Sequence, residues 1–269
     1  MTLHIHSARP GQLRSCQLKD SIWATHGTVL ISGTQALVRL MLMQRQRDKD
    51  QQWNTRGYIS GYRGSPLGMV DQVIWKQGDG LCKAGIEFEP AINEELGATQ
   101  MLGTQRVESD PERTVDGVFG MWYGKGPGVD RAGDALKHGN AYGSSSHGGV
   151  LIVAGDDHGC VSSSMPHQSD QAFQSWHMPV VSPSDVSELI SFGLYGFALS
   201  RYSGAWVGMT ALSEVVESTT TVDLDEIHAE TATWKSPQEV QTLTGHQVPH
   251  DGLHYRWPDL NRPGICRHL

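Results

Sequence analysis

The sequence predicts an α/β fold of the doubly wound type, with a mostly parallel sheet and helices on both faces. The first observation is that short β-branched apolar runs bounded by glycine alternate with longer segments of helical periodicity. The second is composition, since 38% of the 269 residues are hydrophobic and 31 are glycine, as in a globular protein with many loops. Strands that alternate with helices pair in parallel, because each helix returns the chain across the sheet.

The first part of the chain contains two predicted strands and one long helix. "GTVLISG" at 27–33 has the β-branched and apolar residues of a short strand closed by glycine. Apolar residues at helical spacing, followed by a charged end, predict an amphipathic helix over 34–49. "GYIS" at 57–60 is the second predicted strand.

A tight turn, "GYRGSPLG" at 61–68, follows the second strand. Proline suits the first position of a helix and serine suits the cap before it. Ser65 is therefore predicted to cap a helix that begins at Pro66. The strand-like "IEFEP" and a helix starting near Ile92 then repeat the pattern.

The clearest buried strand is "GGVLIVAG" at 148–155, a β-branched run between glycines. The best helix lies in "VSPSDVSELISFGLYGFALSR", where the apolar residues follow one helical face. Its predicted start uses Ser182 as the cap, Pro183 in the first turn and Asp185 as the acid of a capping box. "AWVGMTAL" at 205–212 returns as a strand.

The chain divides into three parts on these patterns. A polar segment covers 1–24, and the predicted α/β domain covers 25–222. Beyond about residue 222 the sequence is polar and rich in histidine and proline, without a periodic segment. We therefore expect 223–269 to be a linker-like tail rather than a second packed domain.

Charge and hydropathy argue against two classes of partner. The net charge is −8 and no basic patch stands out, so nucleic-acid binding is not expected. The apolar stretch around 186–200 is interrupted by serine and glycine and is too short to span a bilayer. The first residues lack the basic-then-apolar layout of a signal peptide, so we expect a cytoplasmic protein without a membrane partner.

The sequence predicts no metal site. The four cysteines are Cys16, Cys82, Cys160 and Cys266. They form no CxxC pair, so neither a zinc site nor an iron–sulfur cluster is expected in this chain. The histidines of the middle third are His138, His147, His158, His167 and His177. None shows an HExxH or other ligand spacing, so hydrogen-bonded or solvent-facing roles are expected.

Three glycine-containing stretches could contact a ligand. The turn at 61–68 and "GDDHG" at 155–159 both follow predicted strands, where ligands bind in open α/β sheets. Helix capping or turn formation explains both at least as well. "YGKGPGVDRAGD" at 123–134 does not match the phosphate loop GxxxxGK[ST], and either a ligand contact or a structural loop fits it.

Two adjacent glutamates, Glu94 and Glu95, stand in "INEELG" at the start of a predicted helix. Acidic residues in a first helical turn complement the positive end of the helix dipole. From the residues alone, a structural role is the expectation for both.

Motifs spread along the chain point to a known family. They include "GTVLISGTQALVRL", "GYISGYRGSPLGMVDQ", "FEPAINEELGATQMLGTQ", "SSSMPHQSD" and, most specifically, "WYGKGPGVDR". From about residue 25 to 225 the chain resembles the N-terminal part of the fused indolepyruvate ferredoxin oxidoreductases. These 2-oxoacid:ferredoxin oxidoreductases use thiamine diphosphate and [4Fe-4S] clusters. They decarboxylate aryl pyruvates oxidatively to aryl acetyl-CoA and pass the electrons to ferredoxin.

The resemblance implies that residues 25–222 form the pyrimidine-binding domain of a thiamine diphosphate-binding fold. Matching "NEELG" to the family motif makes Glu94 the catalytic carboxyl group that faces the aminopyrimidine ring of the cofactor. Glu95 is then expected on the outer face. A carboxyl group at that ring nitrogen helps the cofactor to lose its own thiazolium proton, which starts the reaction.

Further residues follow from the same matching. "GYRGSP" corresponds to a substrate-side loop, which makes Gly64, Ser65 and Pro66 cofactor-binding candidates. Ser65 is also the candidate to hydrogen-bond the carboxylate of the 2-oxoacid. In relatives with separate subunits, the "SSMPHQSD" region carries an acid and an arginine near the substrate. Ser169 and Gln171 take those places here, and no role is assigned to them.

The regions that hold the diphosphate with its magnesium ion, and the clusters, are expected outside this chain. The triplet "GDG" at 78–80 resembles the start of a diphosphate motif, but it is interpreted as a helix C-terminus. The first hypothesis is an oxidoreductase portion that is inactive without its partner domains, with ferredoxin, CoA and a twofold homo-oligomer as further expected partners. The alternative is a truncated, non-catalytic remnant that folds or oligomerises. A nucleotide-binding domain is disfavoured because no GxGxxG follows a strand.

Overall fold

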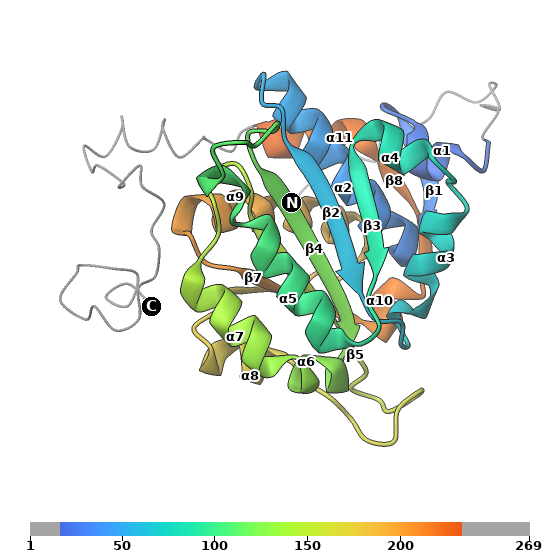
Figure 1. Ribbon diagram of the computed structural model, residues 1–269. Helices are drawn as coiled ribbons and strands as arrows, with labels where there is room; N and C mark the ends of the chain where they lie inside the picture. Colours follow the sequence, from blue (N-terminus) through green and yellow to red (C-terminus); the bar gives the residue numbers. More distant parts are fainter. Residues whose placement is uncertain (1–16, 233–269) are drawn as a thin grey trace, which may run out of the picture.

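The computed structural model describes residues 17–232 (Figure 1). Most of the predicted polar segment, the tail beyond residue 232 and both Cys16 and Cys266 lie outside the described residues. Within the described range, no helix combines the length and the apolar character that a membrane crossing requires.

Six parallel strands form the main sheet, in the order β3-β2-β4-β5-β7-β6. Their bounds are β2 Arg56–Gly61, β3 Ile86–Pro90, β4 Val118–Lys125, β5 Val150–Asp156, β6 Val180–Val181 and β7 Val207–Leu212. Helices cover both faces of this sheet (Figure 1). The predicted fold class, a doubly wound and mostly parallel α/β structure, is confirmed.

The first predicted strand forms, but it lies outside the main sheet. β1 (Thr28–Ser32) pairs antiparallel with β8 (Thr219–Asp223) in a separate two-stranded sheet, in which Thr28 is opposite Asp223. The expectation that it would join the parallel sheet is therefore wrong. Apolar residues at every second position predict a strand, but they do not predict which other strand it pairs with.

Alternate residues of the central strands enter two separate cores. Phe119, Met121 and Tyr123 of β4 belong to one hydrophobic cluster, and Trp122 belongs to the other. The first core lies under α2 (Gly33–Asp50), α3 (Val70–Trp75), α9 (Val186–Ser203) and α11 (Leu224–Ala232). The second lies under α5 (Glu94–Thr104), α6 (Gly126–Arg131), α7 (Gly133–Tyr142) and α8 (Asp170–Ser175). In Figure 1 the helices α5, α6 and α7 cross in front of the strands.

Short helices complete the structure. They are α1 Asp20–Trp23, α4 Gly80–Ala84, α10 Ser213–Val216 and the 3₁₀ turns Leu67–Met69 and Val107–Ser109. The "GDG" triplet at 78–80 lies in the turn between α3 and α4, and its last glycine is the first residue of α4. The triplet therefore leads into a helix, whereas a helix C-terminus was expected.

Two predicted helix starts differ in the structure. Asp185 itself caps α9, because its carboxylate accepts a hydrogen bond from the backbone N–H of Glu188 at 2.8 Å, so the predicted start with Ser182 as cap and Pro183 in the first turn is wrong. The helix predicted to begin at Pro66 also differs. The Ser65–Pro66 bond is cis, a 3₁₀ turn follows, and no side chain caps it, so Ser65 is not the predicted N-cap.

Ordered structure continues past the predicted boundary at residue 222. β8 runs to Asp223 and α11 follows directly, with Leu224 and Ile227 in the first core. The expectation of a coil is therefore wrong for 224–232. A helix of nine residues with few apolar positions gives a weak periodic signal, and packing against α9 stabilises it.

A buried ion pair joins the helices of the first core at the amino edge of the sheet. Arg201 of α9 donates to both carboxylate oxygens of Asp48 in α2, at 2.7 and 2.8 Å. Asp48 is 1% exposed and also accepts hydrogen bonds from Thr55 and Gln44. Arg201 donates further to the backbone oxygen of Gly148, ahead of β5. The pair therefore ties two helices to the beginnings of two strands.

We expect the substitution Arg201→Ala to destabilise the fold by about 3–5 kcal/mol, because the buried Asp48 carboxylate would lose its charge partner. Chemical denaturation measures this effect. Arg113→Ala, at an exposed arginine that donates only a long bond to a backbone oxygen, is the control and should change stability by less than about 0.5 kcal/mol. Equal losses in the two variants would contradict the assigned role of the pair.

A second charged pair lies close to the first. Glu108 accepts hydrogen bonds from the backbone N–H of His147 at 2.6 Å and from the Ser146 hydroxyl at 2.9 Å. Burial alone would raise the pKa of Glu108, but these hydrogen bonds outweigh it and lower the pKa to about 2. The hydrogen bond with Glu108 raises the pKa of His147, against the opposing effect of burial.

The two shifts make the stabilisation by this pair dependent on pH. The contribution of Glu108 is complete above its ordinary pKa of 4.5 and is lost as the pH falls toward 2. The contribution of His147 is complete below its ordinary pKa of 6.5 and is lost as the pH rises through the raised value. Both side chains are charged between these limits.

His147→Gln should therefore lower the melting temperature more at pH 5.5 than at pH 8.5, where the native histidine is losing its charge. Thermal unfolding at the two pH values gives the comparison. His158→Gln, at an exposed histidine, should show little difference between them. A larger loss at pH 8.5 than at pH 5.5 would refute the charge-based account.

Candidate functional site

The candidate site lies at the carboxyl edge of the main sheet. The chain leaves β2 toward α3 on one face and leaves β4 toward α6 on the other, and these two strands are neighbours. The winding therefore reverses between β2 and β4. In open α/β sheets this is where ligands bind, because the diverging loops leave room between them.

Close contacts fix the loops at this edge. The backbone N–H of Tyr62 donates to the oxygen of Tyr123 at 3.1 Å, so the chain after β2 stays paired with β4. Gly64 lies against the aliphatic part of Lys125, where an added Cβ would be 3.1 Å from the lysine Cβ. Pro66 lies over Gly155 at the end of β5. The predicted loop residues Gly64, Ser65 and Pro66 are thus placed beside the ends of β4 and β5.

Glu94 begins α5 and its side chain is sheltered. The side chain is 17% exposed, and its Oε2 atom lies 3.7 Å from the Nε atom of Arg131. Asn93 caps the helix by accepting from the Leu96 N–H at 2.9 Å, which fixes the orientation of the first turn. The backbone oxygen of Glu94 also accepts from the indole N–H of Trp122 at 3.0 Å. Glu95 is exposed, so the two adjacent glutamates face different surroundings.

Gly128 of α6 makes room for the Glu94 side chain. A Cβ at this position would lie 2.7 Å from the Cγ of Glu94 and 3.0 Å from its Oε1 atom, closer than real contacts allow. The glycines of "YGKGPG" therefore admit protein side chains, which is the structural interpretation that the sequence left open. Gly126 does the same for His167, whose Nδ1 atom would be 2.2 Å from an added Cβ.

Ser65 is half-buried, and no hydrogen bond of its hydroxyl group is found within the described residues. A hydroxyl in the loop after β2 is available for a ligand, because its donor and acceptor capacity is not used by the fold.

A buried tyrosine anchors the arginine of the "GYRGSP" loop. The Tyr123 hydroxyl donates a short hydrogen bond to Asp71, and the second oxygen of Asp71 lies 3.4 Å from the Nε atom of Arg63. Burial and this hydrogen bond raise the pKa of Tyr123. Arg63 also stacks over Trp75, with its guanidinium carbon 5.4 Å from the ring centroid. No sequence pattern indicates this chain of contacts, because Tyr123 lies 52 positions from Asp71 along the chain.

A partly buried histidine, His167, links α6 to the end of β5. The Nε2 atom of His167 lies 2.9 Å from Asp130, and its buried Nδ1 atom lies 3.5 Å from the carboxylate of Asp156. Asp156 is fully buried and accepts from the N–H and the hydroxyl of Ser169 at 2.8 and 2.6 Å. Gln171, the other position left without a role, is exposed. Ser169 thus holds a buried acid, which the motif comparison did not predict.

The aspartates of "GDDHG" are used by the fold. Asp157 accepts hydrogen bonds from the N–H groups of Val161 and Ser162 at 2.9 and 2.8 Å, and these bonds lower its pKa. Asp156 is occupied by Ser169. Turn formation therefore accounts for both, and no cluster of metal-ligating side chains occurs in residues 17–232.

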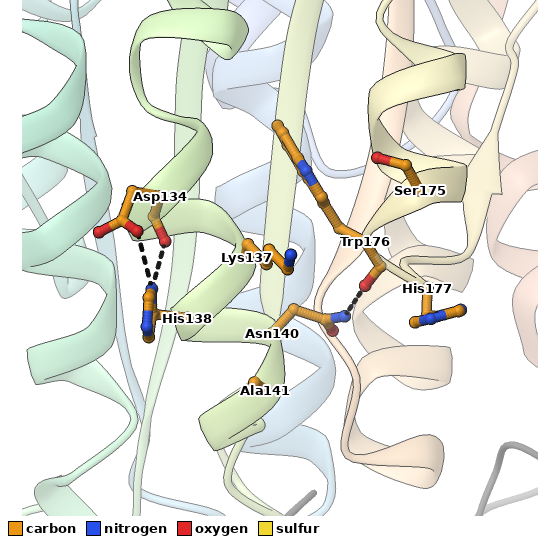
Figure 2. A pocket seen from close by; sticks show the side chains of 8 residues that line it. All are labelled: Asp134, Lys137, His138, Asn140, Ala141, Ser175, Trp176 and His177. Carbon is orange, nitrogen blue, oxygen red and sulfur yellow. Dashed lines mark hydrogen bonds and ion pairs between the residues drawn. The ribbon is translucent and has the colours of Figure 1, made fainter. Parts of the chain in front are cut away.

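A pocket near these elements is separate from the carboxyl-edge loops. A pocket of about 360 Å³ opens between α7 and the end of α8 and is lined by residues such as Lys137 and Trp176 (Figure 2). None of the residues described at the carboxyl edge lines it.

Comparisons with known proteins find similarity to solved structures. No family model matches the sequence, and no curated protein matches it. The fold is similar to a solved structure from Magnetococcus marinus, a 2-oxoglutarate:ferredoxin oxidoreductase with 2-oxoglutarate, coenzyme A and succinyl-CoA bound. The TM-score is 0.55 at 19% sequence identity, over 80% of this chain and 32% of that one. The chain therefore spans about a third of that protein, and the similarity shows a shared fold.

We expect Gly128→Ala to displace the Glu94 side chain, because the new methyl group would overlap it. Alanine favours a helix over glycine by roughly 1 kcal/mol, so a loss of stability in this variant would come from the clash. Thermal unfolding and a crystal structure of the variant test both points. Gly103→Ala in α5, where an added Cβ meets nothing within 4 Å, is the matched control and should be neutral or stabilising. An unmoved Glu94 in Gly128→Ala would contradict the prediction.

Proposed function

We propose that this chain supplies the pyrimidine-binding domain of a thiamine diphosphate-dependent 2-oxoacid:ferredoxin oxidoreductase. The observation that carries the proposal is the sheltered Glu94 carboxylate, at the first turn of a helix and beside the point where the sheet reverses its winding. The fold shared with a 2-oxoglutarate:ferredoxin oxidoreductase supports it. The "WYGKGPGVDR" and "NEELG" motifs favour the indolepyruvate type, with an aryl pyruvate as substrate and aryl acetyl-CoA as product.

The residues around Glu94 fit the aminopyrimidine end of the cofactor. Gly128 lets the Glu94 side chain lie close against α6, which would hold the carboxyl group in place beside the ring. Glu94 would hold the ring by a hydrogen bond to its nitrogen, and α5 would keep the carboxyl group in that position. Bound thiamine diphosphate would supply the electron sink for decarboxylation of a 2-oxoacid.

The loop after β2 would contact the substrate side of the site. The Ser65 hydroxyl is free of hydrogen bonds within the described residues and would donate to the carboxylate of the 2-oxoacid. Gly64 and Pro66 would place the loop, because they pack on Lys125 and Gly155 at the ends of neighbouring strands. None of these three residues is charged, so their proposed role is to position the loop and to offer one hydroxyl group to the substrate.

Exposed apolar side chains surround this edge and favour a covering partner. Tyr62 follows β2, Ile92 follows β3, and Leu96 lies in the first turns of α5, with exposures of 40%, 83% and 46%. Val161 and Met165 in the loop after β5 are 79% and 62% exposed. Exposed apolar groups gathered at one edge are typical of a protein interface. The partner would be the domain that holds the diphosphate and magnesium ion, and the [4Fe-4S] clusters, ferredoxin and CoA would belong to the complete, oligomeric enzyme.

The test compares two adjacent glutamates in a complete enzyme that contains this sequence. Glu94→Gln should lower the rate of 2-oxoacid oxidation, followed by reduction of an artificial electron acceptor, by about 10²–10⁴-fold, because a proton-transfer group is lost. Glu95→Gln is the matched control, since its side chain is exposed one residue further along. Its rate should stay within about twofold of the native enzyme by the usual size of surface effects.

Circular dichroism should show both variants folded. Activity in Glu94→Gln equal to that of Glu95→Gln would reject the proposed role of Glu94. A complete enzyme that oxidises no 2-oxoacid at all with thiamine diphosphate present would reject the proposed reaction.

A further inference from the structure

The pocket between α7 and α8 has a rigid floor. Asn140 of α7 donates from its amide nitrogen to the backbone oxygen of Trp176 at 2.8 Å and accepts from the N–H of Trp206 at 2.9 Å (Figure 2). Asn140 is 8% exposed, and both ends of its amide are used. The turn after α8 is therefore held at a fixed distance from α7 and from the first residue before β7.

An aromatic ring, Trp176, and a cation, Lys137, both line this pocket. Trp176 is half-buried and packs against Gly133 and Phe173, so its ring has a fixed orientation. Lys137 extends from α7 toward Trp176 in Figure 2, and within the described residues its ammonium group has no hydrogen-bond or ion-pair partner. The one acidic side chain of the lining, Asp134, is 3.2 Å from His138 on the same helix.

His177 stands at the rim in a backbone conformation that glycine adopts more easily. Its φ is 57°, in the left-handed region, directly after the last residue of α8 and its C-cap. Glycine is the usual residue at this position of a helix end, because any side chain there is strained. A histidine at this place brings an imidazole to the pocket at the expense of stability. Such a conflict with local preference is typical of functional positions.

We propose that this pocket binds a small aromatic molecule with an anionic group. The ring would stack on Trp176, and the carboxylate or phosphate would meet the Lys137 ammonium group and an N–H of the His177 imidazole. The volume of about 360 Å³ is within the range of small-ligand sites and suits one or two fused rings with a short acidic arm. The pocket shares no residue with the surroundings of Glu94, so the proposal does not depend on the proposed reaction.

Ligand-observed NMR titrations with the full chain test the chemistry of the ligand. The probes are 1-naphthyl phosphate and 1-naphthoate, and we expect dissociation constants on the order of 1 mM or lower for one or both. Cyclohexanecarboxylate keeps the charge without the aromatic ring, and 1-naphthol keeps the ring without the acidic group. Both should bind at least about fivefold more weakly, because each lacks one of the two contacts.

Three variants locate the site. Lys137→Met and Trp176→Leu should each weaken binding of the better probe by about fivefold or more, and Lys83→Met, at an exposed lysine on α4, should leave it unchanged. His177→Gly should weaken binding while its melting temperature stays equal or rises, because glycine relieves the backbone strain. If His177 had only a structural role, the variant would not lose affinity while keeping or gaining thermal stability.

Two results would overturn the proposal. One is the absence of any binding by both aromatic anions at 5 mM, the highest concentration of the titration. The other is binding that Lys137→Met and Trp176→Leu leave intact in folded protein. Preference between the phosphate and the carboxylate probe would identify which acidic group the natural ligand carries.

Discussion

The candidate site depends on the absence of side chains at two positions of α6. Gly126 lies under the ring of His167, and Gly128 lies beside the side chain of Glu94, so any Cβ at either place would overlap a neighbour. These two contacts let a short helix of six residues sit directly against the loops after β3 and β5. Close packing of this kind converts small changes into displacements of neighbouring groups, because the interior has little free volume. The position of Glu94 is thus determined by the residues that surround it as much as by its own helix.

The charge next to Glu94 is compatible with the proposed role of its carboxyl group. Arg131 is 58% exposed and lies 3.7 Å from the carboxylate, which is a longer separation than a strong, bidentate pair would have. An ion pair at this separation, with one partner exposed to solvent, contributes only about 0–1 kcal/mol. A hydrogen bond between a sheltered carboxyl group and a ring nitrogen would be at least as favourable, and Arg131 has solvent into which it can turn. The pair therefore keeps the acid oriented in the free chain without closing the site.

The sequence predicts most of the strands and helices, but it does not predict which of them pair or pack together. The strands at 57–60, 148–155 and 205–212 and the helix after Ile92 were predicted correctly, because their periodicity and glycine boundaries are local properties. The cap at Asp185 is a local contact with Glu188, but Ser182 fits the same local pattern and was predicted instead. The pairing of β1 with β8 and the helix α11 depend on contacts between distant parts of the chain, and local patterns do not encode them. The same holds for the site. The role of Glu94 is a prediction from a motif, whereas the links of His167 to Asp130 and Asp156 join residues 37 and 11 positions apart along the chain, where no spacing rule applies.

The two edges of the sheet carry different kinds of polar groups, which separates stability from function. At the amino edge, the side chains of Asp48 and Arg201 are nearly fully buried, and both oxygens of the Asp48 carboxylate accept hydrogen bonds. At the carboxyl edge, the Nδ1 atom of His167 is buried without a hydrogen bond, and apolar side chains such as Ile92 face solvent. Buried polar groups are normally satisfied and large apolar groups are normally covered, so this edge is the incomplete one. A parallel sheet gathers all its strand ends on one side. One edge can therefore be fixed by charge pairs while the other is left to be completed by a ligand or a partner.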